Sequence, residues 1–143
     1  MKLTKLFGAA SIVLLLGAAP SLASEAPGTW AMQNGKVTVN VTDCGSDLCG
    51  TIVSLKEPIS KIDGKPKIDR ENPDPALRER PLIGLSILVS MKAAGDNQWQ
   101  GAIYNPDDGK TYTGTVLLDG GTMQVQGCVL KLFCKTNTFV RVD

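Results

Sequence analysis

Apolar and polar residues alternate in short runs along most of the chain after residue 27, and turn residues separate these runs. In the clearest run, residues 36–42, the side chains of Val37, Val39 and Val41 fall on one face of a strand. The pattern predicts an all-β protein of eight short antiparallel strands, typical of a barrel or a sandwich. The expected strands are residues 28–32, 36–42, 51–55, 82–91, 98–104, 110–118, 122–127 and 135–142.

Turn signals support this division of the chain. Asn34-Gly35 is the strongest hairpin signal, and Pro106–Gly109 predicts a type I turn followed by a glycine with positive φ. The strand at 82–91 is mostly apolar, so we expect neighbours to cover both of its faces. The other turns are expected at 45–47, 95–97 and 119–121.

The first 23 residues have the pattern of a cleaved signal peptide. Lys2 and Lys5 precede an apolar run at 12–16, and Ser21 and Ala23 provide small residues at the two positions that a signal peptidase reads. A membrane anchor is the alternative, but the apolar run is shorter than the roughly 20 residues that a span needs. We expect residues 1–23 to be removed, so that residues 24–143 form a single exported domain, periplasmic or extracellular.

Charge and histidine content narrow the chemistry. Without Lys2 and Lys5, the 15 basic residues become 13, against 14 acidic ones, for a net charge of −1. This balance predicts no general attraction to nucleic acid or to anionic membranes, and we expect a monomer without stable membrane insertion. Histidine is absent, which excludes Ser-His-Asp and Cys-His catalysis and histidine-ligated metals. We expect no cofactor and no metal.

The four cysteines predict two disulfides, because export places them in an oxidising compartment. A zinc site with four cysteine ligands is the alternative. Its usual ligand gaps are shorter than the four and five residues that lie between Cys44 and Cys49 and between Cys128 and Cys134.

In an up-and-down barrel, alternate turns lie at opposite ends, and this predicts the disulfide pairing. The turn at 34–35, the segment 56–80 and the turns at 106–109 and 128–134 would share one end. The Cys44–Cys49 turn would lie at the other end, about 26 Å away along a strand of eight residues. Bonded cysteines need Cα atoms within about 7 Å. The expected pairs are therefore Cys44–Cys49 and Cys128–Cys134, provided that the segment 56–80 contains no extra strand.

Several motifs resemble known families. Gly28-Thr-Trp30 and Arg141 resemble the calycin signature of lipocalins and fatty-acid-binding proteins. The wider motifs are Cys44…Cys49-Gly50, Asp69…Asn72-Pro73, Arg80-Pro-Leu-Ile-Gly84, Trp99…Gly101-Ala-Ile-Tyr104-Asn-Pro106, Gly109-Lys-Thr-Tyr112 and Phe139-Val-Arg141. Together they are similar to the uncharacterised secreted bacterial domain-of-unknown-function family numbered twenty-one forty-seven.

This resemblance implies a calycin-like (lipocalin-like) barrel. Together with the strand pattern, it leads us to expect an eight-stranded antiparallel up-and-down barrel with a long charged loop between strands 3 and 4. It implies that Trp30 fills the closed end and that Arg141 packs across it, but it implies no established activity. Phe139 stands where the family pattern leads us to expect tryptophan.

The charged segment 56–80 has three interpretations: a solvated disordered loop, an ordered lid over the open end, or part of a catalytic carboxylate site. The carboxylate site would combine Asp69 with an acid of the 106–108 turn. For the lid, Asp74 could cap a short helical turn that begins at Pro75 and is ended by Pro81, with Leu77 pointing inward.

The lid hypothesis also specifies ion pairs at the surface. Arg78 and Arg80 have Asp69, Glu71 and Glu79 as nearby partners, and they could reach Asp107 or Asp108, while Asp69 could pair with Lys110. Such pairs contribute only ~0–1 kcal/mol each, so we expect a shallowly held lid that can be replaced at little cost in stability.

Four aromatic residues are ambiguous. Tyr104 and Tyr112 flank the 106–109 turn, either as a gate at the rim or as a cross-strand aromatic pair, and we favour the pair. Trp30 is expected in the core, and Trp99 could be core or ligand contact.

Three functions are compatible with these features. The first is a non-catalytic binder of a small, largely apolar ligand at the open barrel end. The alternative is a structural or interaction protein of the cell envelope with a packed barrel, and the third is a carboxylate-based enzyme. The candidate ligand or lid residues are Asp69, Asn72, Arg78, Arg80, Trp99, Tyr104, Asp107 and Tyr112.

Overall fold

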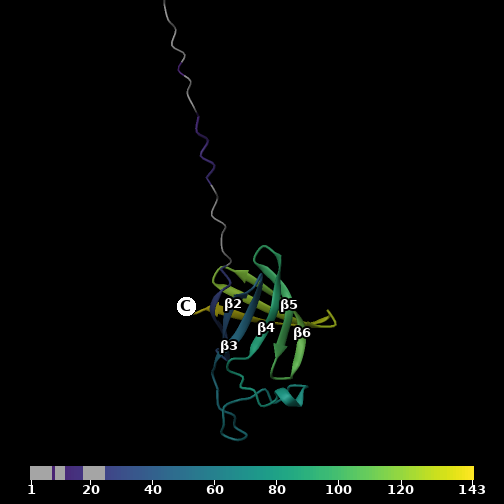
Figure 1. Cartoon of the computed structure of the whole chain (residues 1–143). Coiled ribbons are helices and arrows are strands. Elements are labelled where there is room, and N and C mark those ends of the chain that lie inside the picture. Colours follow the sequence, from purple (N-terminus) through teal and green to yellow (C-terminus); the bar gives the residue numbers. More distant parts are fainter. Residues whose placement is uncertain (1–7, 9–11, 18–24) are drawn as a thin grey trace, which may run out of the picture.

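The computed structural model describes residues 8, 12–17 and 25–143, and Figure 1 shows their arrangement. The predicted signal peptide and its cleavage site lie for the most part outside the described residues. Eight antiparallel strands form one closed barrel, with each strand bonded to the next and β8 bonded to β1. The strands are β1 Gly28–Met32, β2 Val37–Cys44, β3 Asp47–Leu55, β4 Ser86–Gly95, β5 Gln98–Asn105, β6 Lys110–Asp119, β7 Thr122–Val129 and β8 Phe133–Arg141.

The prediction of an eight-stranded up-and-down barrel is confirmed. Between β3 and β4, residues 56–85 add no strand to the sheet, so the alternation of turns between the two ends holds. No helix in the described part of the chain has the length and apolar character needed to cross a membrane.

A buried tryptophan fills the interior at the end where the chain enters the barrel. Trp30 is fully buried, and its indole N–H donates to the Ala26 carbonyl at 2.8 Å. Arg141 is its cross-strand neighbour, with the guanidinium 4.5 Å from the ring centroid. Gly28 leaves room for this arrangement, since a Cβ there would lie 2.3 Å from the Arg141 guanidinium. This closed end has the geometry that the resemblance implied.

Two disulfides, Cys44–Cys49 and Cys128–Cys134, each close one hairpin. These are the pairings that the alternation of turns predicts. The first closes the β2–β3 hairpin and the second closes the β7–β8 hairpin, at opposite ends of the barrel. The bonds fit a location outside the cytoplasm.

The fourth strand differs from its prediction in position and burial. β4 begins at Ser86, because the preceding residues form a turn in which Gly84 has positive φ and donates its backbone N–H to the Ile52 carbonyl. Leu88 and Met91 are buried, whereas Val89 is exposed, so β4 is covered on one face. An irregularity at Ser90, which has positive φ, changes the pairing with β5.

The connecting segment, residues 56–85, runs along the outside of the open end, as the teal chain at the bottom of Figure 1 shows. Isolated bridges join Ile59 to Pro66 and Ile68 to Pro81. Its last residues, Leu82 and Leu85, form a small second core with Ile52 and Tyr104. The segment is therefore ordered and packed against the barrel.

Candidate functional site

A cavity of about 840 Å³ occupies the open end of the barrel. All four turns predicted to share this end, those at 34–35, 106–109 and 128–134 and the start of the connecting segment, contribute residues to its wall. The barrel is thus packed at one end and hollow at the other.

The deep part of the cavity is apolar because alternate residues of each strand point into the barrel. Val39, Met123 and Phe139 are buried residues of the main core that also line the cavity floor. Asn137 lies on β8 opposite Val125 and lines the same wall. Its side-chain amide has no hydrogen-bond partner among the described residues, so it is a polar group free to meet a ligand inside the barrel.

The mouth of the cavity is charged. Four lysines and three carboxylates line it: Lys36, Lys56, Lys67, Lys135, Glu57, Asp107 and Asp108. Lys36 is paired with Asp107, which links the β1–β2 turn to the β5–β6 turn across the mouth. Lys67 lies 4.0 Å from Glu57. Lys56 and Lys135 have no ion-pair partner in the described ranges.

Tyr112 also lines the cavity, and its hydroxyl donates to the Asp108 carboxylate. This hydrogen bond, together with partial burial, raises the pKa of Tyr112 above its ordinary value. The predicted pairing of Tyr112 with Tyr104 is wrong. Tyr112 lies opposite Ile103 and Tyr104 lies opposite Thr111, so the two rings point to opposite faces of the sheet.

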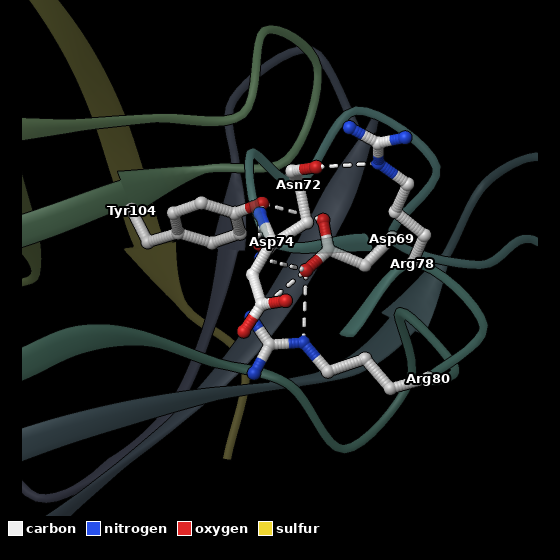
Figure 2. Close-up of polar contacts among 6 residues, drawn as sticks. All are labelled: Asp69, Asn72, Asp74, Arg78, Arg80 and Tyr104. Carbon is white, nitrogen blue, oxygen red and sulfur yellow. Dashed lines mark hydrogen bonds and ion pairs between the residues drawn. The ribbon is translucent and has the colours of Figure 1, made fainter. Parts of the chain in front are cut away.

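Tyr104 is instead one arm of a buried polar network centred on Asp69 (Figure 2). The Tyr104 hydroxyl donates to Oδ1 of Asp69 at 2.6 Å. The Asn72 amide and the Arg80 guanidinium each donate to Oδ2 at 2.8 Å. The Arg80 guanidinium also lies 5.7 Å from the Tyr104 ring centroid. The network therefore ties the connecting segment to β5.

Asp69 stays ionised in this setting although its side chain is 0% exposed. Burial by itself raises the pKa of the carboxyl, but the hydrogen bonds from Tyr104, Asn72 and Arg80 outweigh burial and hold the pKa below its usual value. Burial and the bond to Asp69 raise the pKa of Tyr104. Asp69 consequently acts as a fixed acceptor, with both oxygens occupied.

The predicted pair of Arg80 with Asp69 is present, whereas the predicted pairs to the 106–110 turn are wrong. Asp69 pairs with Arg80 rather than Lys110, and Asp107 pairs with Lys36. Arg78 donates from Nε to the Asn72 carbonyl at 2.7 Å. These bonds form within the segment because its chain folds back on itself, with the Asp69 N–H donating to the Arg80 carbonyl at 2.9 Å.

The predicted helical turn is present. Asp74 caps a 3-10 helix at Pro75–Leu77, and its carboxylate accepts from the Ala76 N–H. Leu77 does not point inward as predicted, because it is 39% exposed, and the helix ends at Leu77, before Pro81.

Close backbone packing also fixes the segment to the β5–β6 turn. Gly109 has φ of 69°, and a Cβ at this position would lie 1.8 Å from the Glu71 carbonyl oxygen. Only glycine fits both the backbone conformation and the approach. The connecting segment is thus a built part of the open end, and the expectation of a shallowly held lid is corrected.

The predicted site residues lie in the polar network, in the cavity wall or in the main core, and Tyr104 belongs to both the network and the wall. Asp69, Asn72, Arg78 and Arg80 join Tyr104 in the network, whereas Tyr104, Asp107 and Tyr112 line the cavity. Trp99 belongs to the main core and does not line the cavity. Sequence reasoning missed Asn137 and the mouth lysines. A polar residue at an inward position of an alternating strand is the signal that could have identified Asn137.

A closed barrel of eight antiparallel strands, with one packed end and one cavity, defines a lipocalin-like protein. The chain belongs to the family described as an uncharacterized protein conserved in bacteria (DUF2147), whose family model matches residues 28–141. Among solved structures it is similar to protein HP1028 from the human pathogen Helicobacter pylori, described as belonging to the lipocalin family. The identity is 26%, 85% of each chain is covered, and the TM-score is 0.71. No curated protein matches the chain.

Proposed function

We propose that this protein is an exported, non-catalytic binder that holds a small, largely apolar ligand in the cavity at the open end. The cavity of about 840 Å³ with its apolar floor carries the proposal. Ligand sites typically have volumes of about 300–1,000 Å³ and combine apolar walls with a few placed polar groups. The relationship to a lipocalin-family protein supports the same class of function.

The lining suggests how such a ligand would be oriented. Its apolar part would contact Val39, Met123 and Phe139 at the floor, and a polar group along its length could bond the amide of Asn137. Lys56 and Lys135 at the mouth would favour a negatively charged end that remains near water. The ligand class is therefore an elongated apolar molecule with one acidic or polar end.

The other two functions have less support. A packed barrel that works only through its surface would have a filled interior, which the cavity argues against. A carboxylate enzyme based on Asp69 would need that group to face a cleft. Asp69 does not line the cavity, and Tyr104, Asn72 and Arg80 occupy its oxygens.

Ligand binding can be tested by filling the cavity. Asn137→Trp places a large ring inside the barrel, and Thr136→Trp places the same ring on the outer face of the same strand. We expect the first variant to lose at least tenfold in affinity for the neutral apolar dye N-phenylnaphthylamine, and the second to bind like the parent. Native mass spectrometry of protein purified from its natural host would show retained ligand as added mass. Equal dye affinity in all three proteins would contradict the proposal.

A further inference from the structure

The tip of the β7–β8 hairpin, residues 129–133, exposes an unusual group of apolar side chains. Leu130, Leu132 and Phe133 are 79%, 80% and 72% exposed, and Val129 is 42% exposed. Single exposed apolar residues are ordinary, but a contiguous group marks an interaction site. In Figure 1 the yellow hairpin of β7 and β8 projects sideways from the barrel wall, so the hairpin tip stands clear of the core.

The backbone conformation of the hairpin tip does not favour an apolar side chain at residue 130. Leu130 and Lys131 have φ of 53° and 58°, and the Leu132 N–H donates to the Val129 carbonyl. A β-turn whose two central residues both have positive φ favours Asn-Gly, because side chains larger than glycine are strained there. The other hairpin turns of the described chain place glycine or asparagine at positive φ, namely Gly35, Gly45, Gly95, Asn97, Gly109 and Gly120. Leu130, an exposed apolar residue, thus occupies a position where asparagine or glycine would be less strained.

The charges around the hairpin tip indicate what it meets. Leu132 and Phe133 line the cavity mouth beside Lys135, and Lys131 lies within the turn itself. Lys36, Lys56 and Lys67 also line the mouth, which makes four lysines against three carboxylates there, and Lys131 adds a fifth lysine in the adjoining turn. Lys56, Lys131 and Lys135 have no ion-pair partner in the described ranges. This end of the molecule is locally basic although the mature chain as a whole is nearly neutral.

Apolar side chains flanked by unpaired lysines are suited to the boundary between headgroups and acyl chains in an anionic lipid bilayer. We propose that the hairpin tip inserts into such a surface and that the barrel docks there with its cavity mouth toward the lipid. This proposal rests on the proposed ligand-binding function. Docking would let an apolar ligand pass between the bilayer and the cavity without crossing water. The disulfide Cys128–Cys134 at the base of the hairpin holds the two strands together while the tip is inserted.

Vesicle flotation tests the docking directly. Vesicles of phosphatidylglycerol and phosphatidylethanolamine should retain the parent protein, and vesicles of phosphatidylcholine alone should retain at least tenfold less. Leu130→Asn combined with Leu132→Thr and Phe133→Thr should lower retention on the anionic vesicles at least tenfold. The turn should keep its shape, because asparagine tolerates positive φ at residue 130, and threonine at 133 suits the start of β8. An unchanged melting temperature would verify the fold.

Matched controls separate the hairpin tip from general stickiness. Val89 and Leu117 are exposed apolar residues on the barrel wall, and Val89→Thr with Leu117→Thr should leave vesicle retention unchanged. Lys131→Gln with Lys135→Gln should reduce retention and weaken its dependence on salt. In Leu130→Trp, the tryptophan emission should shift to the blue on anionic vesicles. Trp30 and Trp99 are already buried, so they should contribute little to this change.

Three outcomes would overturn the proposal. The parent protein could fail to float with anionic vesicles, or the triple tip variant could float as well as the parent. A hairpin tip that instead drives concentration-dependent dimers in gel filtration, without vesicle retention, would be a self-association surface. Asn137→Trp should lose dye binding but still bind vesicles. A parent protein that binds dye but not vesicles would contradict only the docking proposal, and one that binds vesicles but not dye would contradict only the ligand-binding function.

Discussion

The two ends of the barrel are built on different principles. At the closed end, Trp30 is fully buried against the main core, and Arg141 lies over its ring. At the open end the strands continue around a cavity, and the wall outside them is held by the polar network of Asp69 and Tyr104. Apolar packing therefore stabilises one end, while buried hydrogen bonds shape the other without filling it.

This difference explains how the barrel formed by residues 28–141 can be stable and hollow at once. The main core combines Trp30, Met91 and Trp99 with valine and leucine side chains from most of the strands. The second core around Leu82 and Leu85 lies where the connecting segment meets the barrel. The cost of a cavity grows with its volume, and the cavity is confined to the open end, above the main-core residues that form its floor.

The largest effect is expected at the closed end. Trp30→Ala should lower the free energy of unfolding by about 3–5 kcal/mol, because it leaves a cavity under Arg141. Trp30→Phe keeps an aromatic ring and should cost clearly less. Thermal and denaturant unfolding measure both. A melting temperature in Trp30→Ala equal to that of the parent would show that this end does not stabilise the barrel.

The next effect concerns the network at the open end. Asp69→Asn should lower the free energy of unfolding by roughly 3 kcal/mol at neutral pH, because hydrogen bonds to a charged group contribute about 1.5–3 kcal/mol each. The bond from Arg80 should contribute less than the others, because Arg80 is partly exposed to water. Asp63→Asn is the matched control. Asp63 pairs with Arg70 in the same segment, but both are exposed, so this change should barely affect stability.

The same network predicts a pH dependence. The pKa of Asp69 is lowered on folding, so its contribution is complete above the ordinary aspartate pKa of about 4 and is lost as the pH falls through the folded value. The stability difference between the parent and Asp69→Asn should therefore shrink below about pH 4. A difference that stays constant down to the acid transition would contradict the network geometry.

The smallest of these effects is expected for the disulfides, which occur once at each end. Their loops are short, with separations of 5 and 6 residues, so replacing either cysteine pair by serine should cost about 2 kcal/mol and leave a folded barrel. Cys44→Ser with Cys49→Ser should not change vesicle retention, whereas Cys128→Ser with Cys134→Ser should reduce it. Unfolding of either double variant at room temperature would show that the hairpins depend on their covalent links.

The barrel was predictable because its signals are local. Alternation in 36–42 and turn residues such as Asn34-Gly35 mark strands and hairpins wherever they occur in a chain. The pairing of the cysteines followed from counting turns. The predicted start of β4 is too early because Leu82 and Leu85 resemble strand residues, although they belong to the second core, where the connecting segment meets the barrel.

The open end was less predictable because its contacts are distant in sequence and depend on geometry. Asp69 and Tyr104 are separated by 35 residues, and no periodic pattern connects them. Surface ion pairs with Asp107 or Lys110 are equally plausible from the sequence. The backbone of the connecting segment determines which pair Asp69 forms, because it turns Asp69 inward and brings Glu71 against Gly109.

The chain enters and leaves the barrel at the same end, since the Arg141 guanidinium bonds the backbone carbonyls of Glu25 and Pro27. Anything attached to either terminus, such as an affinity tag, a fluorescent protein or a surface linker, would thus emerge on the side opposite the cavity. Immobilisation through a terminus would present the mouth and the hairpin tip to the solution. The two ends could also be joined by a short peptide and the chain reopened in the polar β6–β7 turn, giving a circular permutant with an undisturbed mouth.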